Sequence, residues 1–299
     1  MRNILIIISL ALFPLFGFSQ YYAMDYGILL GGSQYLGEFG GKEKIAQPFI
    51  LDLKMGQTRY ALGGFFRYRV KNNLGVTIQA NWIRLQGADN LSTNPARVGR
   101  NLSFRNDLYE FHFRLEYYFY HVNDVGHTGR YQLDFKAYGF AGFGVFTNNP
   151  KGYSDAYGGW NNLRKLETEG VTYGKIQPTI PFGVGGFYTY KKIHRFGWEF
   201  GARKTFTDYI DDASTVYYDH SGSNQMTQDY ANRYDGVGTS IEPLFYETGE
   251  KRGDPSNKDW YMTTQFSYSH VIRGKHKFTK KSTYNYSSKK RKRRTRAKF

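Results

Sequence analysis

The chain has 299 residues, enough for one large β unit or two ordinary domains, and its mean hydropathy is only -0.60 although 18% of its residues are aromatic. It has no cysteine, which excludes disulfides, thiol catalysis, thiolate metal sites and a lipoprotein anchor. The net charge is +16, but residues 274–299 hold twelve Lys or Arg and no acid, so the rest of the chain carries only +4. The composition therefore indicates a nearly neutral body followed by a basic tail.

The N-terminus has the pattern of a secretory signal peptide. Arg2 precedes an apolar stretch that runs to Phe18, and Gly17 and Ser19 are small residues suited to cleavage after Ser19. We therefore expect residues 1–19 to be a signal peptide, with an uncleaved anchor helix as the alternative. No later stretch approaches the roughly 20 apolar residues of a membrane helix, so any further membrane crossing must use strands.

Eight segments of the body alternate between apolar and polar residues. The pattern is clearest in the fourth, where YEFHFRLEYYFYH (109–121) has aromatic residues or leucine at every odd position from Tyr109 to Phe119. Charged or polar residues occupy the even positions from Glu110 to Glu116. Because successive side chains of a strand point to opposite faces, this pattern predicts strands with one aromatic and one charged face. In chain order, the segments are 22–31, 59–70, 74–85, 107–121, 132–147, 176–190, 195–207 and 259–272.

The connections between these segments alternate in length. The long ones are 32–58, 86–105, 148–175 and 208–258, and the short ones are 71–73, 121–131 and 191–194. This alternation predicts an all-β fold, an eight-stranded antiparallel up-and-down barrel over residues 20–273, with long extracellular loops and both ends on the short-turn side. An Arg facing lipid near the bilayer midplane costs about 2–4 kcal/mol, so we expect a transmembrane barrel with its aromatic face toward lipid. The alternative is a soluble, lipocalin-like barrel with the charges outside.

The charged faces of the strands then line the barrel interior. An eight-stranded barrel is only wide enough for its own side chains. We therefore expect these charges to neutralise one another in a packed polar plug rather than to line an ion path. The predicted interior residues are Glu110, Arg114, Glu116, Asp134, Lys136, Glu199 and Arg203.

An acid-rich stretch at 205–220 is the strongest candidate for chemistry. It offers Asp208, Asp211, Asp212, Asp219 and His220 as acid–base groups at the rim or as oxygen ligands for Ca²⁺. It lacks the spacing of an EF-hand loop, and the histidines of the chain form no HxxxH pair. We therefore expect no catalytic, cofactor or metal site. The alternative is an outer-membrane enzyme that acts on lipid or peptide at the extracellular rim.

The basic tail at 274–299 has the composition of a disordered segment. Strand parity places it in the periplasm, where nucleic acid is not a partner but acidic proteins, peptidoglycan carboxylates and lipid phosphates are available. The alternatives are a solvated tail without a partner and a cell-wall anchor that acts through the tail alone. The candidate partner-binding residues are Lys289, Lys290, Arg291, Lys292, Arg293, Arg294 and Arg296.

Three stretches resemble the PorG-like outer-membrane proteins of the type IX secretion system in Bacteroidota. They are YGILLGGSQYLGEF (26–39), RFGWEFGARKTFTDYIDDASTVYYD (195–219) and RGDPSNKDWYMTTQFSYSHVI (252–272), and the similarity extends over about residues 21 to 273. Its most specific part, which we call the motif loop, contains Thr205, Thr207, Asp208, Tyr209, Asp211 and Asp212.

The resemblance implies a non-enzymatic component of a protein secretion machine that also serves gliding motility in some relatives. Such a protein lies in the outer membrane with both mature ends in the periplasm. There it binds a periplasmic ring of a lipoprotein and its partner subunit, and so tethers the ring to the membrane. The expected partners are this ring, outer-membrane lipids and peptidoglycan. The long basic tail departs from the family pattern, so its contact with the ring or cell wall is a separate hypothesis.

Overall fold

The computed structural model describes residues 24–37, 39, 55–126, 129–130, 132–235 and 241–272. The predicted signal peptide at 1–19 and the basic tail at 274–299 lie outside these residues. The compact barrel unit covers Ala23–Ile272. Its strands are β1 (Met24–Leu36), β2 (Arg59–Lys71), β3 (Leu74–Ala88), β4 (Ser103–Val122), β5 (Leu133–Thr147), β6 (Lys151–Ser154), β7 (Gly159–Asn162), β8 (Ile176–Tyr190), β9 (His194–Thr205) and β10 (Trp260–Ile272). The α-helices among the described residues are α2 (Pro95–Arg100) and α3 (Gln225–Ala231).

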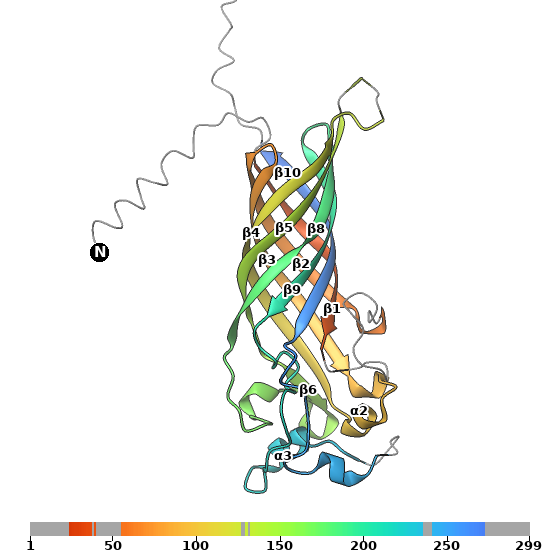
Figure 1. The fold of residues 1–299 in the computed structure, drawn as a ribbon, viewed down its shortest axis with the longest axis vertical. Helices are drawn as coiled ribbons and strands as arrows, with labels where there is room; N and C mark the ends of the chain where they lie inside the picture. The colour runs from red at the N-terminus through yellow and green to blue at the C-terminus, as the bar shows by residue number, and fades with distance from the viewer. Residues whose placement is uncertain are drawn as a thin grey trace, which may run out of the picture. The chain divides into compact units, whose positions relative to one another are not determined.

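Eight of these strands close into an antiparallel barrel (Figure 1). Pairing runs from β1 through β2, β3, β4, β5, β8 and β9 to β10, and β10 pairs with β1 along its whole length, from Met24↔Ile272 to Leu36↔Trp260. The closed ladder leaves no barrel strand with an unpaired edge, as the interior of a bilayer requires. The predicted fold class, an eight-stranded antiparallel barrel, is confirmed.

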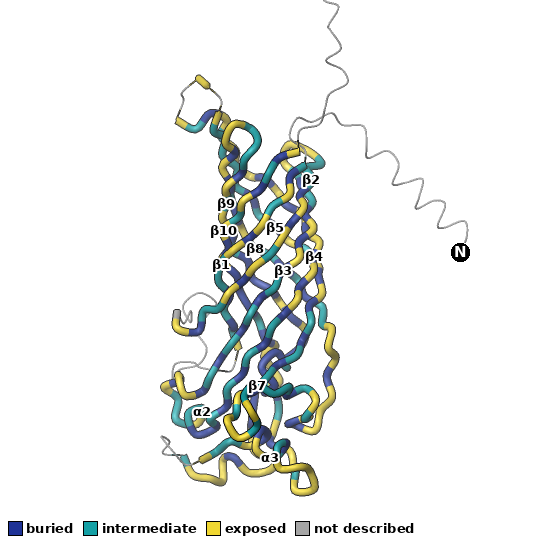
Figure 2. Tube along the Cα trace, turned by 180° about the vertical axis from the view of Figure 1, so that it is seen from behind, coloured by how far each residue is buried: buried dark blue, intermediate teal, exposed yellow. Residues whose placement is uncertain are grey.

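The predicted alternation of apolar and polar residues corresponds to the outer and inner faces of the barrel wall. Along β4, buried and exposed residues alternate from Phe104 to Tyr118, and Figure 2 shows the same change along the other strands. Arg114 has no exposed surface, whereas the odd-numbered aromatics of this strand are roughly half exposed, as with Phe111 at 55%. The charged residues therefore lie inside and the aromatic residues outside.

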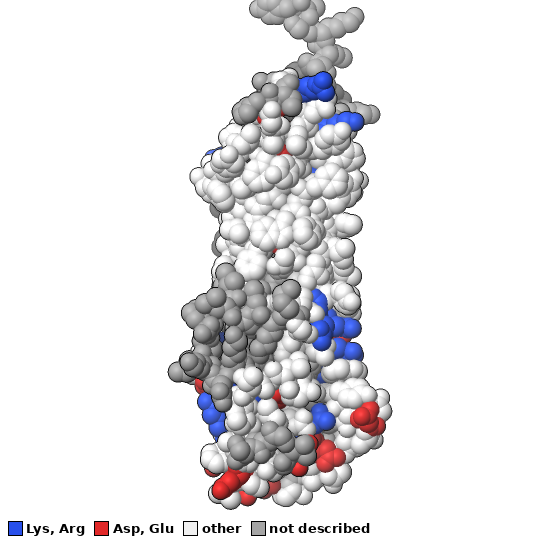
Figure 3. Space-filling view, turned by 90° about the vertical axis from the view of Figure 1, so that its right-hand side faces the viewer, with Lys and Arg blue, Asp and Glu red and all other residues white. Residues whose placement is uncertain are grey.

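On the face that Figure 3 shows, the middle of the outer wall is uncharged, and we call this zone the uncharged belt. Its exposed apolar residues come from every barrel strand, and include Ile28, Phe66, Ile78, Phe113 and Phe143. Tyr60, Trp82 and Tyr109 lie toward the long-loop end of this belt, where aromatic girdles are found in membrane barrels. A closed barrel with such a belt is built to span a membrane.

The two rims of the barrel differ. Short turns join β2 to β3 and β8 to β9, and both ends of the barrel, Met24 and Ile272, lie at this rim (top in Figure 1). The long connections at the other rim fold into a cap that contains α2, α3 and the β6–β7 hairpin. The cap has an apolar core with the adjoining part of the barrel interior, and its members include Tyr35, Leu102, Phe104, Ile210 and Tyr261.

The eight predicted strands match the structure, most of them to within a few residues. β1 continues to Leu36, beyond the predicted end at 31, and still pairs with β10. Alternation is invisible there because Gly31 and Gly32 have no side chain to mark a face. The long connection 148–175 also contains the short β6–β7 hairpin, whose polar sequence carries no period-two pattern.

Candidate functional site

An ion-pair network fills the barrel interior. Arg114 contacts Glu199 at 2.7 Å and Glu116 at 3.1 Å. On another part of the wall, Arg203 Nε lies 3.3 Å from Glu110 Oε1. All five side chains are buried, so each charge is neutralised by a direct partner rather than by bulk water.

Three further interior charges were not identified from the sequence. Arg67 lies 2.8 Å from Glu116 and 3.3 Å from Asp25, and Arg195 also pairs with Asp25. Each of these charges is next to an outward aromatic residue in its strand, as Arg67 is next to Phe66, so strand parity could have found them.

Asp134 and Lys136, which were predicted to be interior, are half-buried. Asp134 accepts a hydrogen bond from the Asp124 amide at 3.2 Å, and Lys136 Nζ lies 5.5 Å from the centre of the Tyr118 ring. Within the described part of the chain, neither side chain forms an ion pair within 4 Å of the network. They border the plug at its short-turn end.

The motif loop closes the other end of the barrel. The Tyr35 hydroxyl of β1 donates a hydrogen bond to Asp211 at 2.5 Å and also contacts the Asp259 carboxylate. Asp259 in turn accepts from the Ile210 amide at 3.0 Å, and its carbonyl accepts from the Thr205 hydroxyl at 2.5 Å. These contacts connect β1, the motif loop and the start of β10 in one buried cluster, which we call the Tyr35 cluster.

A second buried cluster of charges anchors the cap. Arg252 lies 2.8 Å from Glu169 and 3.8 Å from Asp212. Asp212 also accepts hydrogen bonds from Thr168 at 2.5 Å and Tyr173 at 2.6 Å. Burial raises the pKa of Asp212 to about 6, because its hydrogen bonds and Arg252 only partly compensate for lost hydration.

The rest of the acid-rich stretch does not converge on a reaction site. Asp208 is 2% exposed and accepts from the Ser214 hydroxyl at 2.7 Å. Thr207 caps the Tyr209 amide at 3.2 Å, and Asp219 accepts from the Ser221 amide at 2.9 Å. Across the described ranges, no group of three His, Cys, Asp or Glu residues is placed to hold a metal ion. His220 Nε2 lies 2.9 Å from the Thr168 carbonyl oxygen.

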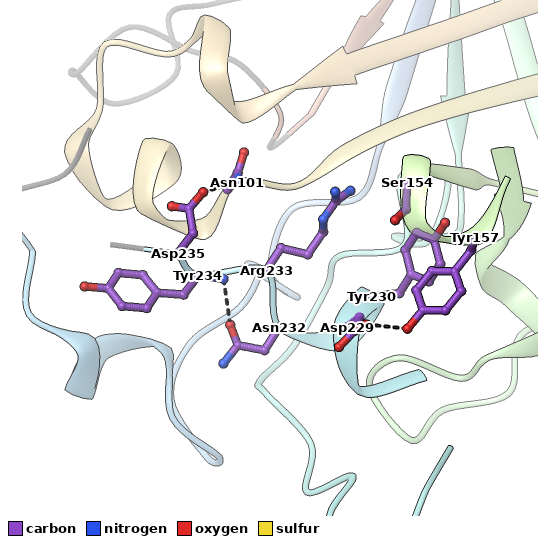
Figure 4. A pocket seen from close by; sticks show the side chains of 9 residues that line it. All are labelled: Asn101, Ser154, Tyr157, Asp229, Tyr230, Asn232, Arg233, Tyr234 and Asp235. Atoms are coloured by element: carbon purple, nitrogen blue, oxygen red, sulfur yellow. Dashed lines mark hydrogen bonds between the residues drawn. The ribbon is translucent and has the colours of Figure 1, made fainter. Parts of the chain in front are cut away.

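A polar pocket of about 300 Å³ opens on the cap surface between α3 and the loop after α2 (Figure 4). Its polar groups largely pair with one another or with nearby backbone. Tyr157 donates to Asp229, Asn101 donates to Asp235 at 3.1 Å, and the Arg233 guanidinium donates to the Tyr153 carbonyl at 2.7 Å. The residues of the pocket therefore make contacts that hold the cap together.

Among the described residues, no helix combines the length and apolar character needed to cross a membrane.

Three solved structures align with the chain at low similarity. OprG from Pseudomonas aeruginosa is 12% identical with a TM-score of 0.36, over 84% of this chain and 97% of that one. Ail, the attachment invasion locus protein of Yersinia pestis, is 9% identical with a TM-score of 0.34, over 84% and 99%. Neisserial surface protein A is 9% identical with a TM-score of 0.34, over 83% and 97%. These similarities are too low to support an inference about function.

Comparison at the sequence level gives a family without a known activity. No curated protein matches the sequence significantly. A domain of unknown function, DUF6089, matches residues 2–226, which is most of the chain and includes the barrel from β1 to β9 as well as the motif loop. The protein therefore belongs to the DUF6089 family.

Proposed function

We propose that this protein is a non-enzymatic component of the bacterial outer membrane that belongs to the type IX protein secretion machinery. There it anchors or assembles the periplasmic lipoprotein ring. The membrane part of the proposal rests on the closed barrel and its uncharged belt, because a bilayer accepts strands only in closed barrels. The secretion part rests on the resemblance to PorG-like proteins.

One observation carries the secretion part. The three resembling stretches form β1, β9 with the motif loop, and β10, which are neighbours in the barrel. Tyr35, Asp211 and Asp259, one from each stretch, meet in the Tyr35 cluster. The resemblance therefore concerns one connected part of the molecule and not three scattered matches.

We propose an orientation from the difference between the two rims. Bacterial outer-membrane barrels have short periplasmic turns and longer extracellular loops, which supports a periplasmic position for the short-turn rim with Met24 and Ile272. The tail at 274–299 follows β10 in the sequence, and its cations suit an acidic surface of the ring or the cell wall. The long loops then form the extracellular cap.

Crosslinking in intact cells tests the proposal. The full chain, a chain that ends at Arg273, and a full-length chain with the seven candidate tail cations changed to Gln are purified from solubilised outer membranes. We expect the ring lipoprotein to accompany the full chain and to be depleted with both tail variants. Recovery of the barrel alone would refute the secretion role, and equal recovery with all three chains would refute the tail contact.

The non-enzymatic part has its own test. Asp208, Asp211 and Asp212 serve the cap from buried positions, whereas Asp219 and His220 are accessible and sit in the same loop. Asp219→Asn combined with His220→Gln therefore removes the accessible acid–base groups of this stretch and leaves its buried carboxylates in place, and the Gln amide can still donate to the Thr168 carbonyl. We expect this variant to keep its partners and to support secretion fully. A specific loss of secretion with a folded barrel and retained partners would instead favour chemistry at the rim.

A further inference from the structure

A hollow of about 510 Å³ lies on the outer wall of the barrel at the cap side, and we call it the arginine hollow. Gly32 of β1 lies at its floor and, having no side chain, leaves the hollow open. A Cβ added at Gly32 would lie 2.8 Å from the Thr58 Cγ2 atom. Three arginines from three successive strands surround it: Arg59 of β2, Arg84 of β3 and Arg105 of β4.

The hollow begins where the uncharged belt ends. Tyr60, which lines it, is 68% exposed at the belt's edge. Arg84 follows Trp82 by two residues on the same outer face of β3, about 7 Å further toward the cap at the usual rise per residue. Figure 3 shows basic side chains gathered at this border of the belt. In a bilayer this depth is that of the lipid headgroups.

The positive charge of the hollow is only partly neutralised. Arg84 makes a two-pronged contact with Asp107, at 2.6 and 3.1 Å. Arg59 donates instead to the neutral Gln86 side chain at 2.7 Å and to the Thr58 carbonyl at 2.8 Å. The Arg105 guanidinium lies 4.3 Å from the centre of the Trp160 ring, and its Nε has no hydrogen-bond partner. Within the described residues, no carboxylate lies within 4 Å of Arg59 or Arg105.

We propose that the arginine hollow binds the phosphate group of a lipid in the leaflet that faces the long loops. Guanidinium groups match phosphate oxygens with paired, charge-assisted hydrogen bonds. Arg59 and Arg105, which have no described carboxylate within 4 Å, converge at headgroup depth on this hollow, beside aromatic residues that suit the acyl boundary. The acyl chains of the same lipid would lie against the belt. The inference rests on the membrane placement and is independent of the secretion role.

Lipid binding in a neutral detergent tests this inference. The probe is lipid A carrying both phosphates, and its dephosphorylated form has the same acyl chains without the charge. Native mass spectrometry counts the lipid retained by the unmodified barrel, by the double variant Arg59→Gln with Arg105→Gln, and by Lys204→Gln. The double variant leaves the Arg84–Asp107 pair in place. Lys204 is an exposed cation at the cap-side end of β9, 5.9 Å from the Trp260 ring centre, and serves as the matched control.

We expect the double variant to bind the phosphorylated lipid about tenfold or more weakly, since it removes two charge-assisted contacts. Lys204→Gln should stay close to the unmodified barrel, and the dephosphorylated lipid should bind all three proteins alike. Equal retention by the double variant, or an equal loss with Lys204→Gln, would overturn the inference, the latter because it would indicate diffuse attraction. Complete displacement by millimolar inorganic phosphate would also overturn it, because the hollow would then be a site for the free anion. Unchanged heat-modifiable mobility on gels confirms that each variant is folded.

Discussion

Arg252→Gln should open the cap without unfolding the barrel. Arg252 is 3% exposed, pairs with Glu169 at 2.8 Å and Asp212 at 3.8 Å, and donates to the Ala231 carbonyl at 3.2 Å. Gln removes the charge and leaves two buried carboxylates without their cation. Removing one partner of a buried ion pair costs about 3–5 kcal/mol. Opening of the cap should therefore become roughly a hundredfold or more easier.

Hydrogen exchange gives a local readout of this change. The Ser214 and Thr215 amides both donate to Glu169 at 2.9 Å, so their protection reports on this cluster directly. Lys251→Gln is the matched control, because Lys251 is next in the chain but exposed, and its 3.8 Å contact with Asp254 is worth at most about 1 kcal/mol.

Equal exchange rates of the two amides in Arg252→Gln and Lys251→Gln would refute this role of Arg252. Loss of protection of the β4 amides together with the cap would also refute it, since the barrel ladder should hold without the cap. The effect should shrink near pH 5, where Asp212, with its pKa raised to about 6, takes up a proton and no longer needs Arg252.

Three further predictions concern the titration of Asp212, the barrel interior and the Tyr35 cluster. Burial raises the pKa of Asp212 to about 6 from an ordinary 3.8, so between these values the folded cap holds a proton that the open loop releases. The free energy of opening the cap should therefore fall by about 3 kcal/mol as pH rises from about 4 to 6, and then level off. Asp212→Asn should abolish this pH dependence. The opening free energies are measured by hydrogen exchange, corrected for the intrinsic exchange rate at each pH. Arg114→Leu should lower the free energy of barrel unfolding in urea by about 3–5 kcal/mol because Glu116 and Glu199 lose their cation, whereas the half-exposed Arg84→Gln should cost about 1 kcal/mol or less. Tyr35→Phe should destabilise the cap by about 1–3 kcal/mol, read from faster exchange of the Ile210 amide, and an unchanged rate would mean that the hydroxyl does not hold the Tyr35 cluster together.

The barrel could be predicted from sequence because its signals are local. In a strand such as 109–121, the two faces can be recognised from a few consecutive residues. The alternation of loop lengths then predicts the order of the strands. Exceptions occur near the cap, where Met262 has the same strand parity as the exposed Phe266 and Tyr268 but is only 2% exposed. At the cap-side ends of the strands, beyond the uncharged belt, the loops and not the lipid determine whether a residue is buried.

The cap could not be predicted for the opposite reason. Tyr35 and Asp211 are 176 positions apart, and Tyr35 and Asp259 are 224 apart, so no periodic pattern connects them. The carboxylates of 205–220 could be recognised as unusual, but only their burial distinguishes a structural acid from a reactive one. Asp211 and Asp212 are each 1% exposed, and they accept hydrogen bonds from other cap residues and from Tyr35 of β1.

The position of the Tyr35 cluster gives the motif loop a structural role that does not depend on a partner. Closing the barrel requires β1 to find β10 across more than two hundred residues, and the entropy of closing such a loop opposes this pairing. The Tyr35 cluster lies at the cap-side end of that seam, beside the last pair, Leu36↔Trp260, and adds side-chain hydrogen bonds where the ladder stops. Changes in Asp211 or Asp259 should then impair partner binding only as far as they open the cap or the seam. The ring contact proposed above is better sought at the short-turn rim, which carries both ends of the barrel, Met24 and Ile272.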